Sequence, residues 1–467
     1  MNYIKSFFSI VLLASMVTAG CNKKLEVEPQ QNITPDQIKT EGDVLAVLYG
    51  TYSLLQGSNA FGERYMLAAD LLAAENHTAW KGTFRDYLDL YNKAQINTNL
   101  IAQGIWTTSY STINTLNTVL SKTDLVNQDD RAAVIGEAKF LRGLVYFELV
   151  NYFGKPYSAG STTTNLGVPL MLEPVFSYDE QRDKKPRAKV EEVYTQIIAD
   201  LTAAAASLPE ETSDGRVTKW AAHAILSRVY LNQAKYDLAA TAANEVIGYY
   251  GDLPGTFDNA FNNEGTPGGE DIFAIMQTSQ SNAGTSNNGL TTFYLPKTSN
   301  DPTIAGGGRG DMQASPAYIN IFEAGDDRRA FTYTGVSITG SSGRYSKKWA
   351  VFYRNIPVVR LGEMYLTRGE ANYRKGGAPI GDNTPLEDIN AVRTRSNATP
   401  LVAIVDGSEF VSERFRELAF EGDRLWTLKR LKLNIDGKPY DHNLLVLPIP
   451  LREREVNQNL EQNGGYQ

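Results

Sequence analysis

Apolar residues return at helical spacing in segment after segment of this chain, and this periodicity constrains the fold more than any other feature. The stretch 131–154, "RAAVIGEAKFLRGLVYFELVNYFG", ends in a glycine that stops a helix. Its apolar residues on one helical face are Val134, Ala138, Leu141, Val145 and Leu149. The stretches 43–55, 105–122 and 189–209 repeat the pattern. The chain is therefore predicted to be mainly α-helical.

The stretch 224–247, "AILSRVYLNQAKYDLAATAANEVI", adds small residues where two paired helices would touch. Its packing residues match those of a tetratricopeptide helix pair: Leu226, Ser227, Tyr230, Ala234, Tyr236, Ala239 and Ala243. The stretch 358–377 continues in the same style. Such pairs stack so that each covers the apolar face of its neighbour. The predicted scaffold is a series of tetratricopeptide-like helix pairs.

A long segment, from Gly251 to about Gly343, is instead rich in Gly, Asn, Ser and Thr. A segment of this length does not form one structureless linker inside a compact domain. We expect short strands and long ordered loops mounted on the scaffold, where binding groups usually lie. A smaller loop region is expected at 57–87. Together these loops would form an irregular, loop-rich face for ligand.

The N-terminus, "MNYIKSFFSIVLLASMVTAGC", has a single charged side chain and an apolar run too short to span a membrane, so we interpret 1–20 as a signal peptide. "VTAGC" resembles the lipobox of bacterial lipoproteins, in which the cysteine, here Cys21, is acylated. The alternative is a cysteine placed by chance near a cleavage site. If Cys21 is acylated, residues 21–42 are the lipidated N-terminus and tether. Residues 43–467 are expected to form a single domain with a loop-rich insert at about 251–343.

Charge and missing motifs disfavour several functions. A formal net charge of −8 argues against nucleic acid as a partner, because phosphate binding needs a concentrated basic surface. The three histidines show no metal-ligand spacing, and His223 is expected to pack within a helix pair. The chain has neither a GxSxG nucleophile turn nor a phosphate loop ending in GK[ST]. We expect no metal, no cofactor and no catalytic residue.

The stretch 411–430, "VSERFRELAFEGDRLWTLKR", nevertheless resembles a catalytic site, because the carboxylates of Glu413, Glu417 and Glu421 recur every four residues. On a continuous helix they would form one row opposite an apolar face. A glycosidase needs carboxylates on opposing sides of the scissile bond, which one row does not provide. Arginines elsewhere could pair with the row and fix the register of the helices: Arg360, Arg368, Arg393 and Arg395. We favour a structural role over a catalytic one.

Several blocks resemble, in order, those of the SusD/RagB family of Bacteroidetes outer-membrane lipoproteins. "GEAKFLRGLVYFELVNYFG" followed by "GVPL" is similar to its signature helix. "GRVTKWAAHAILSRVYL", "PVVRLGEMYLTRGEA" and "INAVRTRSNA" resemble the next blocks. "SERFRELAFEGDRLWTLKR", with Thr427 where an aspartate is common, and the closing "LPIPLREREVNQNLEQNGGY" resemble the last two.

The resemblance implies four tetratricopeptide-like helix pairs carrying a loop-rich face, and a scaffold role for the glutamates of 411–430. It implies an outer-membrane, lipid-anchored protein facing the cell exterior. Its partner would be a SusC-like TonB-dependent transporter, over whose mouth the lipoprotein sits as a lid. Family members capture nutrient, usually glycan, and do not hydrolyse it.

Sugars present a flat C–H face and a rim of hydroxyls, so exposed aromatic rings beside amides suit them. The stretch "ENHTAWKGTFRDY" offers Asn76, Trp80 and Phe84, and "GLTTFYLPK" offers Phe293 and Tyr294. Trp349 follows in a further loop. We predict that these six residues bind ligand, with Trp80 first among them. The alternative is that these loop aromatics fold over the helical core.

Two other functions remain open at this point. RagB-like members imply a peptide or protein-fragment receptor with the same transporter partnership. A lipoprotein enzyme would show weak hydrolysis of a bound polymer, lost on changing Glu417. The residues alone do not separate glycan from peptide, since an abundance of tyrosine suits both.

Overall fold

The computed structural model describes residues 35–212, 214–261 and 268–466, so the signal peptide, Cys21 and most of the tether lie outside the described residues. The chain divides into a unit that ends at Lys39 and a unit from Thr40 to Gln467. The described part of the first unit holds one short 3-10 helix, η1 (Pro35–Gln37). All other elements belong to the second unit.

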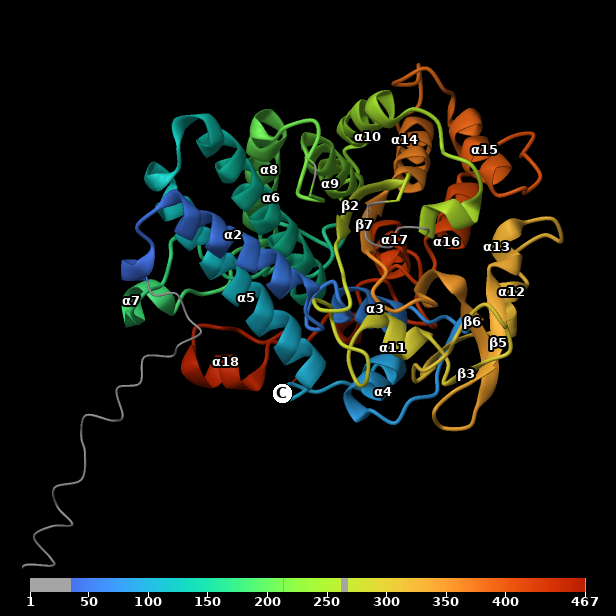
Figure 1. The fold of residues 1–467 in the computed structure, drawn as a ribbon, viewed down its shortest axis with the longest axis horizontal. Helices are drawn as coiled ribbons and strands as arrows, with labels where there is room; N and C mark the ends of the chain where they lie inside the picture. Colours follow the sequence, from blue (N-terminus) through green and yellow to red (C-terminus); the bar gives the residue numbers. More distant parts are fainter. Residues whose placement is uncertain (1–34, 213, 262–267, 467) are drawn as a thin grey trace, which may run out of the picture. The chain divides into compact units, whose positions relative to one another are not determined.

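Eight helices form the scaffold, and each packs against the next in chain order (Figure 1). They are α2 (Glu41–Gln56), α5 (Leu100–Ser121), α6 (Gln128–Phe153), α8 (Val190–Ser207), α9 (Lys219–Asn232), α10 (Tyr236–Tyr250), α14 (Leu361–Lys375) and α15 (Pro385–Arg395). Taken two at a time they make four stacked pairs. The prediction of a mainly α, tetratricopeptide-like scaffold is confirmed.

The first scaffold helix shows why these segments are helical. Thr40 caps the N-terminus of α2 and forms a capping box with Asp43. The buried residues of α2 are the face that its periodicity predicts: Val44, Leu48, Thr51 and Leu55. Burying one leucine side chain of this kind contributes about 1.5–3 kcal/mol. Most of the stability of such a helix therefore comes from its packed face rather than from its caps.

Small residues allow neighbouring helices to pack closely. A Cβ on Gly369 of α14 would lie 2.9 Å from the Cβ of Asp388 and 2.9 Å from the ring of Phe410. Ala239, Ala240 and Ala371 pack with Leu231 in one buried cluster between α9, α10 and α14. These contacts explain why Gly and Ala recur at fixed positions in the helix-pair segments.

The other helices lie outside this series of pairs. They are α3 (Arg64–Leu72), α4 (Arg85–Asn92), α7 (Glu180–Asp183), α11 (Leu290–Tyr294), α12 (Pro316–Ile319), α13 (Asp327–Ala330), α16 (Ser408–Leu418), α17 (Asp423–Arg430) and α18 (Leu451–Val456), with the 3-10 helices η2 (Thr123–Leu125), η3 (Phe257–Phe261), η4 (Lys347–Trp349) and η5 (Asn443–Leu445). The prediction of a loop at 57–87 is wrong for α3. Every residue of α3 after Arg64 is buried, so this helix has no polar face to reveal its period.

The segment 251–343 contributes short strands and ordered loops, as expected. One sheet has the strand order β1-β4-β6-β5-β3: β1 (Thr78–Trp80), β4 (Met312–Ala314), β6 (Ser342–Ser346), β5 (Thr332–Val336) and β3 (Thr298–Ser299). All its pairings are antiparallel, with Ala79 opposite Gln313 and Ala314 opposite Arg344. A second sheet pairs β2 (Asp271–Ile275) with β7 (Ile356–Arg360). The first sheet thus joins the N-terminal loop region to the central insert.

The stretch 411–430 is not one continuous helix. Helix α16 ends at Leu418, and helix α17 begins at Asp423. Between them, Phe420 and Gly422 have φ values of 67° and 77°. The left-handed backbone at these two residues breaks the helix. The prediction that Glu413, Glu417 and Glu421 share one helical row is therefore wrong for Glu421, which lies in the turn.

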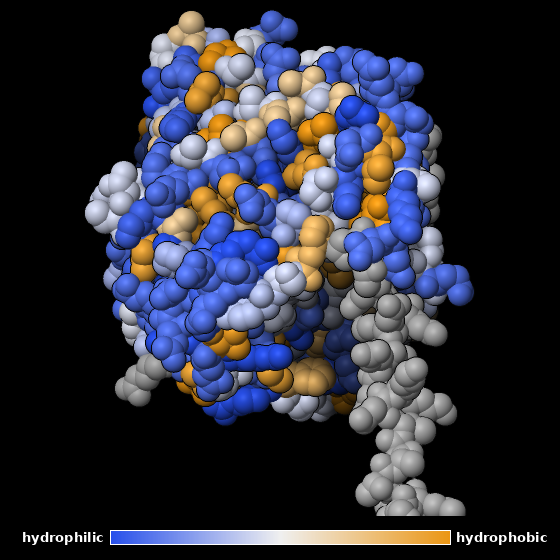
Figure 2. Space-filling view, turned by 90° about the vertical axis from the view of Figure 1, so that its left-hand side faces the viewer, coloured by the Kyte–Doolittle hydropathy of each residue, from blue (hydrophilic) through white to orange (hydrophobic). Residues whose placement is uncertain are grey.

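Among the described residues no helix is both long enough and apolar enough to cross a membrane. The side of the molecule that carries α7 and α18 shows small groups of hydrophobic residues separated by hydrophilic ones (Figure 2). Exposed Phe176 and Tyr178 lie in the segment just before α7. Scattered apolar residues of this kind are normal on a protein surface and do not by themselves mark a binding face.

Candidate functional site

A groove of about 530 Å³ lies where β1, β4 and β6 meet. β1 comes from the N-terminal loop region and the other two strands from the central insert, so both regions that the sequence marks for ligand contribute to it. Its volume is in the range of small-ligand sites. This β1–β4–β6 groove is lined by Ala79, Lys81, Gln313, Ala314, Ser315, Pro316, Ile319, Asn320, Ser341, Ser342, Gly343 and Arg344.

The groove is lined by apolar residues, Ala79, Ala314, Pro316 and Ile319 among them, together with cations, amides and hydroxyls. Gln313 is buried, and its side-chain amide donates to the Tyr345 hydroxyl at 2.8 Å, which holds the Gln313 side chain in place. Asn320 and Ser342 are exposed at its rim, so their polar groups are open to a ligand. Amides and hydroxyls both donate and accept hydrogen bonds, which suits a ligand rich in hydroxyl groups.

Successive side chains of β1 point to opposite faces of the sheet, and the side chain of Trp80 points away from this groove. Ala79 and Lys81 line the groove, whereas Trp80 between them is only 6% exposed. Its ring centroid lies 5.2 Å from that of Tyr87 and 5.9 Å from that of Phe293, which is fully buried. The expectation that Trp80 and Phe293 are exposed is wrong, because successive side chains of a strand point to opposite faces and the interior takes the ring.

Asn76 and Phe84 keep accessible surface. Asn76 is exposed, in the left-handed region at φ 62°, beside a second hollow of about 220 Å³ that Tyr91 also lines. Phe84 is half-buried at the outer edge of the aromatic cluster, where the guanidinium carbon of Arg309 lies 4.5 Å from its ring centroid. A ligand role for these two residues stays a prediction.

Tyr294 and Trp349 lie in the core, each 1% exposed. The Tyr294 hydroxyl donates to the Asp70 carboxylate at 2.5 Å, and burial raises the pKa of that carboxyl to about 7. The Trp349 indole N–H donates to the carbonyl of Phe420 at 2.8 Å. The expectation of exposed rings is wrong for both residues, since each ring is buried and finds its hydrogen-bond partner in the interior, in α3 for Tyr294 and in the turn after α16 for Trp349.

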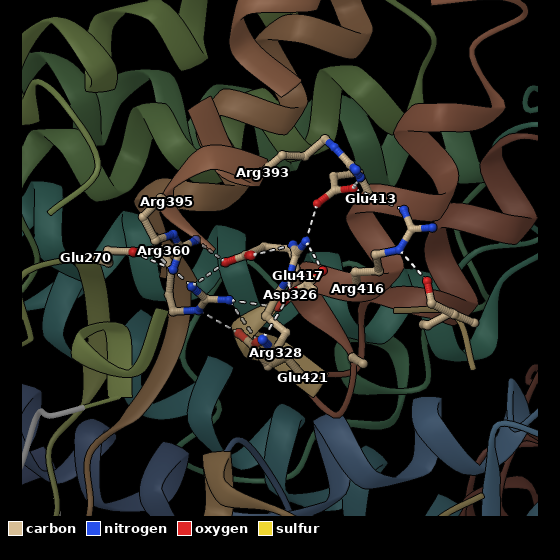
Figure 3. A network of polar contacts seen from close by, with 12 residues as sticks. Glu270, Asp326, Arg328, Arg360, Arg393, Arg395, Glu413, Arg416, Glu417 and Glu421 are labelled. Atoms are coloured by element: carbon tan, nitrogen blue, oxygen red, sulfur yellow. Dashed lines mark hydrogen bonds and ion pairs between the residues drawn. The ribbon is translucent and has the colours of Figure 1, made fainter. Parts of the chain in front are cut away.

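The glutamates of 411–430 are the centre of a buried ion network (Figure 3). Glu417 accepts from Arg395 at 2.6 Å and from Arg360 at 3.2 Å through Oε1. Its Oε2 accepts from Arg328 at 3.2 Å. Glu421 in the turn binds Arg360 at 2.8 Å. These carboxylates are held from several sides at once, an arrangement that fixes the elements carrying them.

Glu413 completes the network one turn earlier in α16. It pairs with Arg328 at 2.6 Å, Arg393 at 2.7 Å and Arg416 at 3.1 Å. The predicted pairing with Arg360, Arg393 and Arg395 is confirmed across the network as a whole. The prediction is wrong for Arg368, which pairs with Asp388 of α15 at 2.6 Å instead.

The electrostatics of the network suit structure rather than proton transfer. Burial by itself would raise the pKa of Glu417, but Arg395, Arg360 and Arg328 together hold that pKa below its usual range. Its side chain has no exposed surface. A general acid needs a pKa near the working pH and contact with the substrate, and Glu417 has neither. Glu417 and the carboxylates that share its arginines therefore have a structural role.

The groove residues Lys81, Asn320 and Arg344 were not predicted from the sequence, because they are not aromatic and follow no ligand-binding motif. A signal was present in "HTAWKG": in a strand that buries Trp80, its neighbours must point the other way. Arg328 was not predicted either, because its place in the network depends on a short helix in the insert. Within the part of the chain that the structure describes, no three His, Cys, Asp or Glu side chains cluster as metal ligands would.

Fold and groove together define a class of protein: a stacked helix-pair scaffold that presents a groove on a loop-rich face. Two family models match this chain. Residues 24–231 match the family described as "Starch-binding associating with outer membrane", and residues 328–444 match the SusD family. The chain belongs to the SusD/RagB family.

Known relatives span the whole chain. SusD-like protein P2 of Formosa agariphila is 27% identical, covering 98% of this chain and 98% of its own. The starch-binding protein SusD of Bacteroides thetaiotaomicron is 24% identical and covers 99% of each chain. A SusD superfamily structure from Bacteroides vulgatus superposes with a TM-score of 0.79 at 23% identity, over 92% of this chain and 100% of that one. At this identity the structural likeness shows the fold alone.

Proposed function

We propose that this protein is a cell-surface lipoprotein of the outer membrane that captures oligo- or polysaccharide. It delivers the ligand to a SusC-like TonB-dependent transporter, for which it serves as the lid. The observation that carries the proposal is the full-length similarity to SusD-type proteins, one of them a starch-binding protein. The β1–β4–β6 groove supports it with a site of suitable size, in which amides and hydroxyls lie beside apolar side chains.

The proposal assigns binding and no reaction to this chain. The carboxylate row that resembles an active site is buried and paired with guanidinium groups, so a polymer cannot reach it. The groove holds hydroxyl and amide groups that bind sugars by hydrogen bonds, together with two cationic side chains. Lipid attachment at Cys21 would keep the groove at the membrane surface without a spanning helix.

The test is calorimetric titration of the full chain, purified in detergent, against a polysaccharide panel and a tryptic peptide mixture. We expect saturable binding to at least one polysaccharide. Binding to peptides alone would replace the proposal by a peptide-binding receptor of the RagB type. Absence of binding to both the polysaccharides and the peptides would leave no support for ligand capture by this chain.

The transporter partnership needs its own test. The full chain, tagged at its C-terminus, is expected to retain a TonB-dependent β-barrel through purification from outer membranes in detergent. A Cys21→Ser variant provides the control, because it removes the predicted acylation site and should shift the protein out of the membrane fraction. Equal incorporation of a labelled fatty acid by the variant and the natural chain would exclude a lipid anchor at this residue, and this readout does not depend on the transporter.

A further inference from the structure

The second hollow, of about 220 Å³, lies where three segments distant in the sequence meet. These segments are the turn after α3, the end of α4 and a tight turn at 435–438, which follows α17. The hollow is lined by Ala74, Asn76, Tyr91, Asn92, Lys93, Asp436 and Lys438. We call it the Tyr91 hollow. It shares no lining residue with the β1–β4–β6 groove, so it is a separate site.

A buried lysine holds the three segments of the Tyr91 hollow together. Lys93 is only 6% exposed, and its ammonium group forms an ion pair with Asp436 of the tight turn. The same group donates to the backbone carbonyl of Tyr91 at 3.0 Å and to that of Leu71 in α3 at 3.4 Å. One cation is thus bound by all three segments. The walls of the hollow are therefore fixed without a ligand, which lowers the entropy cost of binding one.

The backbone around the Tyr91 hollow is strained. Glu75 and Asn76 have φ values of 44° and 62°, and Lys93 and Asp436 have φ values of 53° and 48°. Of the nine non-glycine residues with positive φ in the part of the chain that the structure describes, these four lie in or directly beside the hollow. Asn and Asp tolerate this left-handed region, whereas Glu and Lys are uncommon in it. Because strained backbone clusters at ligand sites, its concentration here points to binding.

The Tyr91 hollow offers an aromatic ring and unused amides. Tyr91 is half-buried, so part of its side chain is accessible from the hollow. Asn76 and Asn92 are exposed, and neither side-chain amide forms a hydrogen bond with any residue that the structure describes. An amide both donates and accepts hydrogen bonds. A ring with free amides beside it suits a sugar, which presents a C–H face and a rim of hydroxyl groups.

The Tyr91 hollow and the groove are neighbours. Asn76 lines the hollow, and its backbone carbonyl accepts from the hydroxyl of Ser315, which lines the groove. Further along the same stretch, Ala79 lines the groove as well. A volume of about 220 Å³ is below the range of about 300–1,000 Å³ for drug-sized ligands, so the hollow suits one sugar ring rather than a chain.

We propose that the Tyr91 hollow is a second sugar-binding site, which takes one ring of the captured glycan. The ring of Tyr91 covers the flat face of the sugar, and the amides of Asn76 and Asn92 bind hydroxyl groups at its rim. The inference rests on the proposed glycan-binding function and adds a site to it. A polymer bound at two neighbouring sites is held more tightly than a short fragment, because its second contact is intramolecular.

The test uses the full chain in detergent and titrates it with starch, laminarin, xylan, galactomannan and alginate. Tyr91→Leu removes the ring, Asn92→Ala removes one amide, and Asn76→Gly removes the other while keeping a residue that adopts the left-handed backbone. Each is expected to weaken binding of the polysaccharide by about two- to ten-fold. Tyr178→Leu is the matched control, because Tyr178 is 65% exposed outside the hollow, and it should leave the affinity unchanged. Melting curves check that each variant is folded.

Hydrogen exchange locates the contact without relying on affinities. Adding the polysaccharide that binds is expected to slow exchange in peptides that contain 74–78 and 434–438. The same peptides in Tyr91→Leu should be slowed less at equal polysaccharide concentration. Slowing confined to peptides from β4 and β6 would overturn the inference.

The affinities separate this inference from the function on which it rests. Polysaccharide binding that Asn320→Ala in the groove weakens, but that no variant in the Tyr91 hollow weakens, would overturn the inference and leave glycan capture standing. Equal weakening by the control Tyr178→Leu would also overturn it. Absence of binding to the whole panel would overturn the inference together with the proposed function.

Discussion

Replacing Glu417 by glutamine tests the structural role of the ion network most directly. The side chain is buried, and its two oxygens accept from three arginines at 2.6–3.2 Å. Glutamine has nearly the same shape but carries no charge, and its NH₂ group faces donors where an oxygen stood. The change therefore removes a negative charge from among guanidinium groups without creating a cavity.

The loss of unfolding free energy in Glu417→Gln depends on the carboxylates that remain paired with the three arginines. Removing one partner of a buried ion pair costs about 3–5 kcal/mol when it leaves an uncompensated charge. Arg395 and Arg360 retain Glu270 at 2.9 and 3.0 Å. Arg328 retains Asp326 at 2.8 Å. Because every guanidinium keeps a carboxylate, we expect the lower end of the range, about 3 kcal/mol.

Thermal unfolding of the two proteins measures this loss. Unfolding entropy is about 2.1 cal/mol/K per residue, so a unit that runs from Thr40 to Gln467 has about 0.9 kcal/mol/K, and the melting temperature should fall by about 3 °C. Glu455→Gln is the matched control, because Glu455 is exposed on α18 and its loss should not change the melting temperature. An unchanged melting temperature in Glu417→Gln would refute the structural role.

The pH dependence gives a second check on the same variant. The pKa of Glu417 is lowered in the folded protein. Its contribution to stability is therefore fully present above the unfolded pKa of about 4.3, and is lost as pH falls toward the folded pKa. The difference between the two proteins should stay constant from neutral pH down to about 4.3 and shrink below it. A difference that persists unchanged to about pH 3.5 would show that the loss is not electrostatic.

The structure predicts the stability effects of three further substitutions. Trp349→Phe removes the donor to the Phe420 carbonyl and should lower the free energy of unfolding by about 1–3 kcal/mol in denaturant titration, with ligand affinity unchanged. Gly422→Ala forces a Cβ to within 3.0 Å of the Met66 backbone at φ 77°, and should lower the melting temperature by at least about 1 °C. Burial lowers the pKa of Lys429 to about 7, so the stability it costs is recovered as pH rises from about 7 toward 10. Lys429→Met should abolish that rise in melting temperature.

The scaffold could be predicted from the sequence because its helices have one buried and one solvated face. The apolar positions of 131–154 and 43–55 recur at helical spacing, and both segments are helices with those residues buried. The same reasoning fails for α3, where Tyr65 to Leu72 are all buried. It also fails at Gly422, since periodicity does not show that the backbone turns left-handed there.

The site was harder to predict because the sequence does not show which side of a loop faces the interior. Trp80, Phe293 and Trp349 lie in loop-rich stretches, yet all three rings are buried. A large ring contributes several times more by burial than a small polar side chain, so the interior takes it wherever the backbone allows. The sequence therefore indicated the segment around β1, which borders the groove, but Lys81 rather than Trp80 lines it.

The ion network and the groove are connected through η4, which directly follows β6. Lys348 in η4 donates to the carbonyls of Glu417 and Ala419 at 2.7 and 3.0 Å and to Glu421 at 2.5 Å. β6 carries Arg344 only a few residues before this anchor. Buried ion pairs of this kind contribute more to fixing register than to net stability. The turn that carries Glu421 thus helps to hold the strand that borders the groove.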